Sequence, residues 1–91
     1  MDYIVNHDET AILVEQEKNR VKDEIIQQYI DLRKEKRISQ EKIASLTGIA
    51  RTNIIRIESK RNVPTIEVLT KLAMALDMEL EIKFVEKKDK K

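Results

Sequence analysis

The sequence predicts a small, mostly α-helical domain that ends in one β-strand. Its 91 residues contain one Gly and one Pro, and 38% of them are charged, a composition that favours helices over loops. Aromatic residues make up only 3% of the chain, so we expect an aliphatic core. Apolar residues recur at helical spacing through most of the chain, and strict alternation replaces that spacing only after residue 77. A chain of this length forms one domain with a limited core, which favours a partner surface.

The first third of the chain is predicted to be one long helix. Asp8 is a suitable N-cap, and no Gly or Pro follows it before residue 48. An apolar stripe with helical spacing runs along this segment: Val14, Val21, Ile25, Tyr29 and Leu32. We expect helix over most of residues 8–36, straight or bent near residues 19–23. The apolar residues 3–5 before it form either a short strand or a packed arm.

We divide this segment into an N-terminal arm and helical extension, residues 1–20, and the start of a domain that covers residues 21–77. The extension is acidic and amphipathic. It either completes the core or a dimer interface, or it offers a surface that binds another protein, for instance a basic one.

Residues 39–59 are predicted to form two short helices joined by a glycine turn. Ser39 is a preferred N-cap, and Ile43 and Leu46 lie on one face of the helix that follows. Gly48 takes the left-handed geometry that ends a helix, and a second helical period starts with Ile54. Two helices joined by such a turn are the layout of a helix-turn-helix, whose second helix enters the DNA major groove.

One further helix and a strand complete the prediction. Pro64 keeps Val63 out of helical geometry, Thr65 caps the next helix, and Asp77 ends it. Residues 78–85 then alternate apolar with charged side chains, which predicts a strand. This strand needs a partner, either its own copy across a two-fold axis or residues 3–5. In the first case three side chains form the dimer interface: Leu80, Ile82 and Phe84. Residues 86–91 are expected to be a disordered charged tail.

The net charge of +1 is unevenly distributed along the chain. Residues 1–32 carry a balance of −5, residues 33–62 a balance of +6, and residues 63–91 are neutral. The positive charge therefore coincides with the helix-turn-helix, as expected of a surface that faces phosphates.

Other classes of protein are poorly supported by the composition. The chain has no cysteine and one histidine, His7, so we expect no enzyme, no metal site and no cofactor. No apolar run in the sequence exceeds five residues, which is too short to cross a membrane. We expect a cytoplasmic protein.

The chain resembles the helix-turn-helix family that includes the Cro and cI repressors and the Xre-type regulators. With Gln40 as the first motif position, four residues fall where the family has its small residue, its turn glycine and its core aliphatics: Ala44, Gly48, Ile54 and Ile57. The resemblance covers residues 29–76. It implies a buried ion pair between Arg33 and Glu58. The chain departs from the family at Arg37, where Gly is usual, and at Ala50, where Ser or Thr often caps the second helix.

The resemblance also implies which side chains meet DNA. Four outward-facing residues of the second helix would read bases: Arg51, Thr52, Ile55 and Arg56. Five others are positioned to hold phosphates: Ser39, Gln40, Asn53, Lys60 and Arg61. Ile55 either reads a thymine methyl or lies against another protein.

We therefore expect a sequence-specific transcriptional regulator of double-stranded DNA, an autoregulating repressor that binds a palindromic operator as a homodimer. The chain is also similar to antitoxins of HigA type, which implies a basic toxin as a second partner. The alternative is a protein-interaction module that uses the same fold without specific DNA binding.

Overall fold

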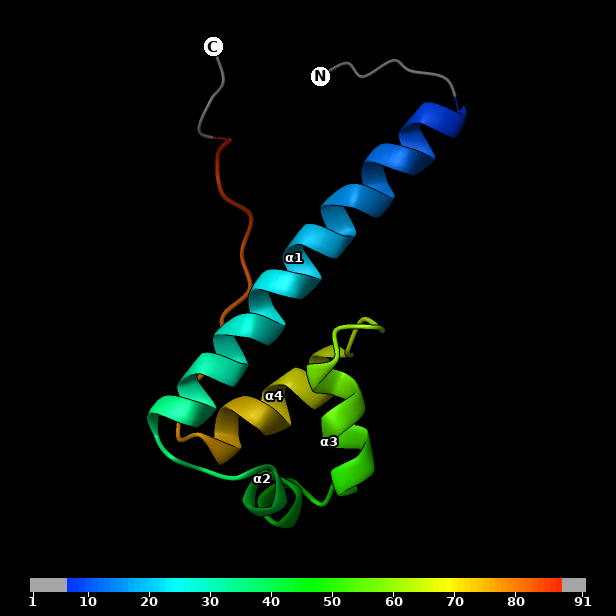
Figure 1. The fold of residues 1–91 in the computed structure, drawn as a ribbon. Helices are drawn as coiled ribbons and strands as arrows, with labels where there is room; N and C mark the ends of the chain where they lie inside the picture. Colours follow the sequence, from blue (N-terminus) through cyan, green and yellow to red (C-terminus); the bar gives the residue numbers. More distant parts are fainter. Residues whose placement is uncertain (1–6, 88–91) are drawn as a thin grey trace.

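A computed structural model describes residues 7–87. This part of the chain contains four helices: α1 (His7–Glu35), α2 (Gln40–Thr47), α3 (Arg51–Glu58) and α4 (Ile66–Ala75). The C-terminal half of α1 packs with the three short helices, while its N-terminal half projects away from them (Figure 1). The predicted helical architecture is confirmed.

Helix α1 is continuous over 29 residues, which confirms the predicted long helix and shows no interruption near residues 19–23. The boundary that we predict between the extension and the domain, at residues 20 and 21, falls inside this helix. Residues 3–5 lie outside the described part of the chain.

The core lies where the four helices meet, and it is almost entirely aliphatic. Ile43 from α2 and Ile54 from α3 are fully buried, and Leu72 of α4 and Leu76, directly after α4, are buried beside them. Tyr29 of α1 packs against these side chains with 6% of its surface exposed. Ile43 and Ile54 therefore pack the two helices of the helix-turn-helix against α1 and α4.

Local capping explains where the short helices begin. The Ser39 hydroxyl accepts a hydrogen bond from the Lys42 N–H at 3.0 Å, and the Thr65 hydroxyl accepts one from the Val68 N–H at 3.1 Å. Both caps were predicted from the residue type alone and are confirmed.

Three helices end in residues with left-handed backbone geometry that are not glycine. Arg37 has φ 59° after α1, Lys60 has φ 65° after α3, and Asp77 has φ 61° after α4. After α1 the Arg37 N–H donates to the Lys34 carbonyl and the Ile38 N–H donates to the Arg33 carbonyl, both at 3.0 Å. These two bonds satisfy carbonyl groups at the helix end and hold Arg37 in a conformation that favours glycine.

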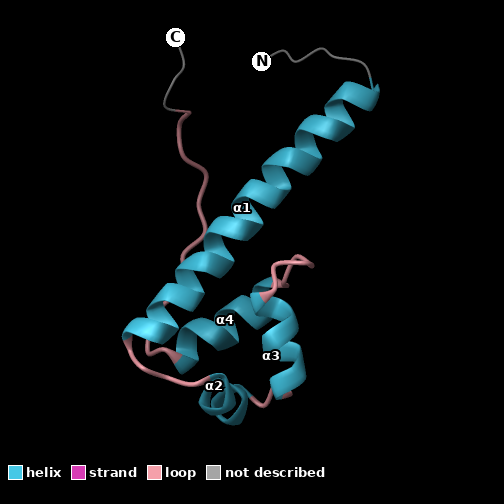
Figure 2. Cartoon of the chain, viewed as in Figure 1, coloured by secondary structure: helices cyan, strands magenta, loops and turns pink. Residues whose placement is uncertain are grey.

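The predicted C-terminal strand is wrong for the described residues. Residues 78–87 contain no strand and run as a loop (Figure 2). Leu80 and Glu81 line one pocket with Ile25 and Gln28 of α1 along this path. A strand exists only through backbone pairing with another strand, and the described part of the chain offers none. Alternation of side chains in the sequence therefore does not establish a strand in this single chain.

Candidate nucleic-acid interface

Helix α3 presents one exposed face that contains the four predicted base-reading residues. Arg51, Thr52, Ile55 and Arg56 are all exposed. Ile54, between them in sequence, is fully buried. Positions 1, 2, 5 and 6 of a helix share one side, so the four side chains lie together on the side away from the core. Two guanidinium groups, one hydroxyl and one apolar side chain are thus available on this face.

The turn before α3 holds this face at a fixed angle to α2. Gly48 has φ 79°, and its N–H donates to the Ala44 carbonyl at 2.9 Å. The Thr47 hydroxyl donates to the Ile43 carbonyl at 2.8 Å and accepts from the Ile49 N–H at 3.1 Å. The turn is therefore hydrogen-bonded on both sides of its glycine.

The start of α3 lacks a side-chain cap, as the sequence predicts. Ala50 occupies the N-cap position with φ −58° and ψ 143° and makes no side-chain hydrogen bond. Its carbonyl accepts from the N–H groups of Asn53 and Ile54. The first N–H groups of α3 therefore have no capping side chain and stay open to an external acceptor.

Glu58, the last residue of α3, is the centre of a buried hydrogen-bond network that anchors this helix. Arg33 donates to it twice, from Nε to Oε2 and from Nη2 to Oε1, both at 2.9 Å. Tyr29 donates its hydroxyl to Oε2 at 2.9 Å, and Gln40 donates its amide to Oε1 at 3.0 Å. The network joins α1, α2 and α3, and each carboxylate oxygen accepts two hydrogen bonds.

The ion pair of this network confirms the one implied by the family resemblance. Arg33 and Glu58 keep only 10% and 9% of their side-chain surface exposed. A third bond, from Arg33 Nη1 to the Ile38 carbonyl at 3.0 Å, satisfies the rest of the guanidinium. Burial, followed by the hydrogen bond to the negative Glu58, raises the pKa of the Tyr29 hydroxyl above its ordinary value. Tyr29 therefore stays protonated and remains a donor.

The sequence does not predict that Tyr29 and Gln40 belong to this network. Tyr29 lies in the apolar stripe of α1, where a buried tyrosine needs a hydrogen-bond partner for its hydroxyl. That need is the one sequence feature that indicates a polar partner for Tyr29. Gln40 is predicted to hold a phosphate, yet its amide donates to Glu58 and the residue is half-buried. Nothing in the sequence separates these two uses of a glutamine.

Lys60 is also held by the protein. Its Nζ donates to Gln27 Oε1 at 2.5 Å, and its carbonyl accepts from Lys22 Nζ at 2.7 Å. The end of α3 is therefore tied to the middle of α1 by a second link. The remaining predicted phosphate ligands, Ser39, Asn53 and Arg61, are exposed.

Two other kinds of feature, a membrane-spanning helix and a metal-binding cluster, are absent from the described residues. Within residues 7–87, no helix is long and apolar enough to cross a membrane. The same part of the chain has no cluster of three or more His, Cys, Asp or Glu side chains that could hold a metal ion.

Comparison with known families agrees with this geometry. A model of the helix-turn-helix family HTH_3 matches residues 30–83, which include α2, α3, α4 and the end of α1 that carries Arg33. No curated protein and no solved structure matches the chain. Because the family match covers more than half of the chain, the protein belongs to the HTH_3 helix-turn-helix family, the Xre, Cro and cI type of DNA-binding, non-enzymatic domain.

Proposed function

We propose that the protein is a sequence-specific transcriptional regulator in the cytoplasm that binds a palindromic operator as a homodimer and represses its own promoter. The observation that carries this proposal is the exposed face of α3. It displays Arg51, Thr52, Ile55 and Arg56 to solvent while Glu58 fixes the other end of the helix. A helix held in this way can enter a major groove without a change in the fold.

Three types of base contact fit the α3 face. Arg51 and Arg56 each suit a guanine, because a guanidinium offers two parallel donors to O6 and N7. Thr52 suits a thymine methyl or a base-edge acceptor. Ile55 keeps 44% of its surface exposed, and a thymine methyl would cover it. An isoleucine there makes a T·A pair the expected preference at one operator position.

Phosphate contacts would come from the edges of the motif. Ser39, Asn53 and Arg61 are exposed and can donate to phosphate oxygens. Gln40 and Lys60 would contribute through backbone groups or through small rearrangements, since their side chains already bind Glu58 and Gln27. The balance of +6 over residues 33–62 gives a binding affinity that falls with salt.

The homodimer is proposed because helix-turn-helix readers bind paired half-sites about one helical turn apart. The C-terminal residues Leu80, Ile82 and Phe84 are candidates for part of its interface. Ile82 keeps 62% of its surface exposed, and Phe84 is fully exposed.

The direct experiment is selection of bound duplexes from a random DNA pool by the full chain. The expected result is a palindrome whose half-sites are spaced by about one helical turn, roughly 10 base pairs, or a multiple of it. Selection by the Arg51→Ala variant should lose preference at one position in each half-site and keep the others. Recovery of unrelated sequences by both proteins would instead favour the protein-interaction module.

A second candidate role is that of an antitoxin, and the charge of the N-terminal third favours it. Residues 1–32 carry a balance of −5, which suits a basic toxin. The test is co-expression with the product of the neighbouring reading frame. Rescue of growth by this chain, together with a stable complex, supports the antitoxin role, and growth arrest that this chain does not relieve contradicts it.

A further inference from the structure

The N-terminal half of α1 is exposed to solvent along most of its length. Every side chain from residue 10 to residue 18 is exposed. Four large apolar side chains of this segment remain more than half exposed: Ile12, Leu13, Val14 and Val21, at 56%, 53%, 60% and 53%. A helix of this length is marginal in water unless its apolar side packs against something. The family match begins only at residue 30, so this extension is additional to the shared domain.

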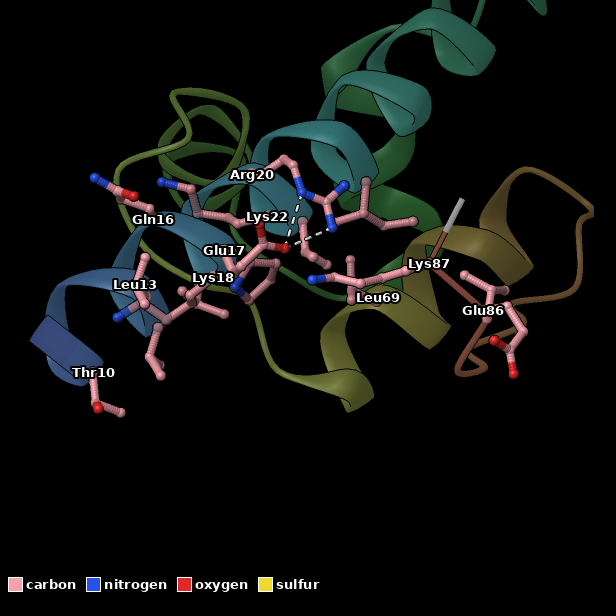
Figure 3. A pocket seen from close by; sticks show the side chains of 16 residues that line it. Thr10, Leu13, Gln16, Glu17, Lys18, Arg20, Lys22, Leu69, Glu86 and Lys87 are labelled. Carbon is pink, nitrogen blue, oxygen red and sulfur yellow. Dashed lines mark hydrogen bonds and ion pairs between the residues drawn. The ribbon is translucent and has the colours of Figure 1, made fainter. Parts of the chain in front are cut away.

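The exposed side chains form one wall of a groove. Leu13, Val14, Val21 and Ile25, here called the apolar face of α1, line a groove of about 1120 Å³. The opposite wall is formed by Val63, Pro64 and Leu69, and by residues 85–87 of the C-terminal segment. In Figure 3, Leu13 and Glu17 come from α1, Leu69 from α4, and Glu86 and Lys87 from the C-terminal segment. The apolar face is therefore continuous with the segment that carries the proposed dimer residues.

We propose that the apolar face of α1 binds the same face of a second copy of this chain, with the two α1 helices antiparallel. The two-fold axis passes between Glu17 and Lys18. This register places Val14 opposite the partner's Val21, and Val21 opposite the partner's Val14. The inference rests on the proposed homodimer and assigns it an interface.

In the antiparallel orientation, the apolar and charged side chains of residues 14–21 are complementary to those of the second copy. Val14 and Val21 are two helical turns apart, so both lie on the stripe that meets the second helix. Glu17 and Lys18 both line the groove, and the antiparallel register brings each Glu17 to the partner's Lys18. A parallel register would instead bring Glu17 to the partner's Glu17, which like-charge repulsion disfavours.

The ion pairs that these residues already make are compatible with the pairing. Glu17 accepts from Arg20 at 2.9 Å, and Lys18 pairs with Glu15 at 2.9 Å, all within the same helix. A second copy would extend these pairs into an alternating network at the centre of the contact, between the two layers formed by Val14 and Val21. None of the four base-reading residues of α3 lines this groove, so the pairing does not use the exposed face of α3.

Cysteine cross-linking in the absence of DNA tests the register directly, because the chain contains no cysteine. Val14→Cys and Val21→Cys variants are prepared separately, then mixed and oxidised mildly. The antiparallel register predicts that the mixture forms disulfide-linked dimers several-fold faster than either variant alone. Faster self-linking of either single variant, or no linking in the mixture, would overturn the proposal.

Sedimentation equilibrium gives the second measurement. The Val14→Asp/Val21→Asp variant should keep its helical circular dichroism and sediment as a monomer, since both side chains are already exposed. The matched control is Ile12→Asp/Leu46→Asp, where the two side chains are 56% and 52% exposed and neither lines the groove, and it should remain dimeric. A dimer that survives the α1 substitutions, or a wild-type chain that is monomeric, contradicts the proposal. Operator binding is measured separately on the same samples, so failure of the pairing and failure of DNA recognition are distinguishable.

Discussion

Arg33 and Glu58 form a two-pronged ion pair in which Arg33 Nε and Nη2 donate to different oxygens of the same carboxylate, both at 2.9 Å. The pair joins the last turn of α1 to the last residue of α3. Parallel hydrogen bonds of this kind fix orientation as well as distance. The recognition helix is thus held at its C-terminal end while its exposed face stays free.

Loss of either partner of this pair should strongly destabilise the fold. Arg33→Met leaves the buried Glu58 charge without its main partner. Glu58→Gln replaces one carboxylate oxygen with an amide NH₂ group, which cannot accept the hydrogen bonds that the surrounding donors make to Glu58. We expect the free energy of unfolding to fall by about 3–5 kcal/mol in either variant. Urea titration followed by circular dichroism measures this. Arg61→Met, at an exposed site, should change it by no more than about 0.5 kcal/mol, and an equal effect of Arg33→Met and Arg61→Met would contradict the assignment.

The raised pKa of Tyr29 predicts a specific loss of stability in alkali. Burial and the neighbouring Glu58 carboxylate keep its hydroxyl protonated in the folded chain, while the unfolded chain loses that proton near pH 10. The unfolded state therefore binds fewer protons above pH 10, and the free energy of unfolding falls as pH rises. Tyr29→Phe should remove a slope of about 1.4 kcal/mol per pH unit in that range.

Tyrosinate absorbance near 295 nm provides a direct readout, because the chain has two tyrosines and no tryptophan. In the wild-type protein one of the two should ionise only as the helical signal is lost. Tyr29→Phe should lack that late step. Ionisation of both tyrosines near pH 10 in a folded protein would disprove the shift.

Gly48 should be required for its backbone conformation and not for space. Its φ is 79°, and a Cβ added there would meet no atom within 4 Å. Gly48→Ala should therefore destabilise the protein by about 1–2 kcal/mol, the strain of a left-handed residue, and Gly48→Asn should cost less. Thermal unfolding of the two variants tests this, and equal losses would point to a packing effect instead.

The uncapped start of α3 predicts a stabilising substitution. Ala50 has extended backbone geometry and no side-chain hydrogen bond, so Ala50→Ser should add a cap worth about 1 kcal/mol. Ser39→Ala is the reverse experiment, since it removes the bond from the Lys42 N–H and should lose a similar amount. A destabilised Ala50→Ser variant would show that the site cannot accept a cap.

The sequence predicted those parts of the fold that depend on neighbouring residues. Ser39, Gly48 and Thr65 act through groups within four positions, so residue type and spacing were sufficient. The strand at residues 78–85 failed because strand formation depends on a partner that periodicity does not reveal. Lys60 likewise binds Gln27, 33 residues earlier, and no local sequence pattern predicts such a contact.

The candidate interface shows the same division. The exposed face of α3 follows from helical spacing, and the Arg33–Glu58 pair followed from family resemblance. The hydrogen bond from Gln40 to Glu58 could not be predicted in this way, because it depends on how α2 and α3 are placed relative to each other. The side chains on the exposed face of α3 were predictable from the sequence. Whether Gln40 binds Glu58 or a phosphate was not.

The most direct test of the account is the binding of the full chain to its own upstream DNA over a salt series, compared with unrelated DNA. The wild-type protein should bind the upstream DNA selectively, with an affinity that falls steeply as salt rises. Arg51→Ala/Arg56→Ala should abolish that selectivity, while Lys34→Ala/Lys71→Ala, which removes the same charge outside α3, should retain it. Equal, weak binding of every DNA, unchanged by the α3 substitutions, would contradict recognition through this helix.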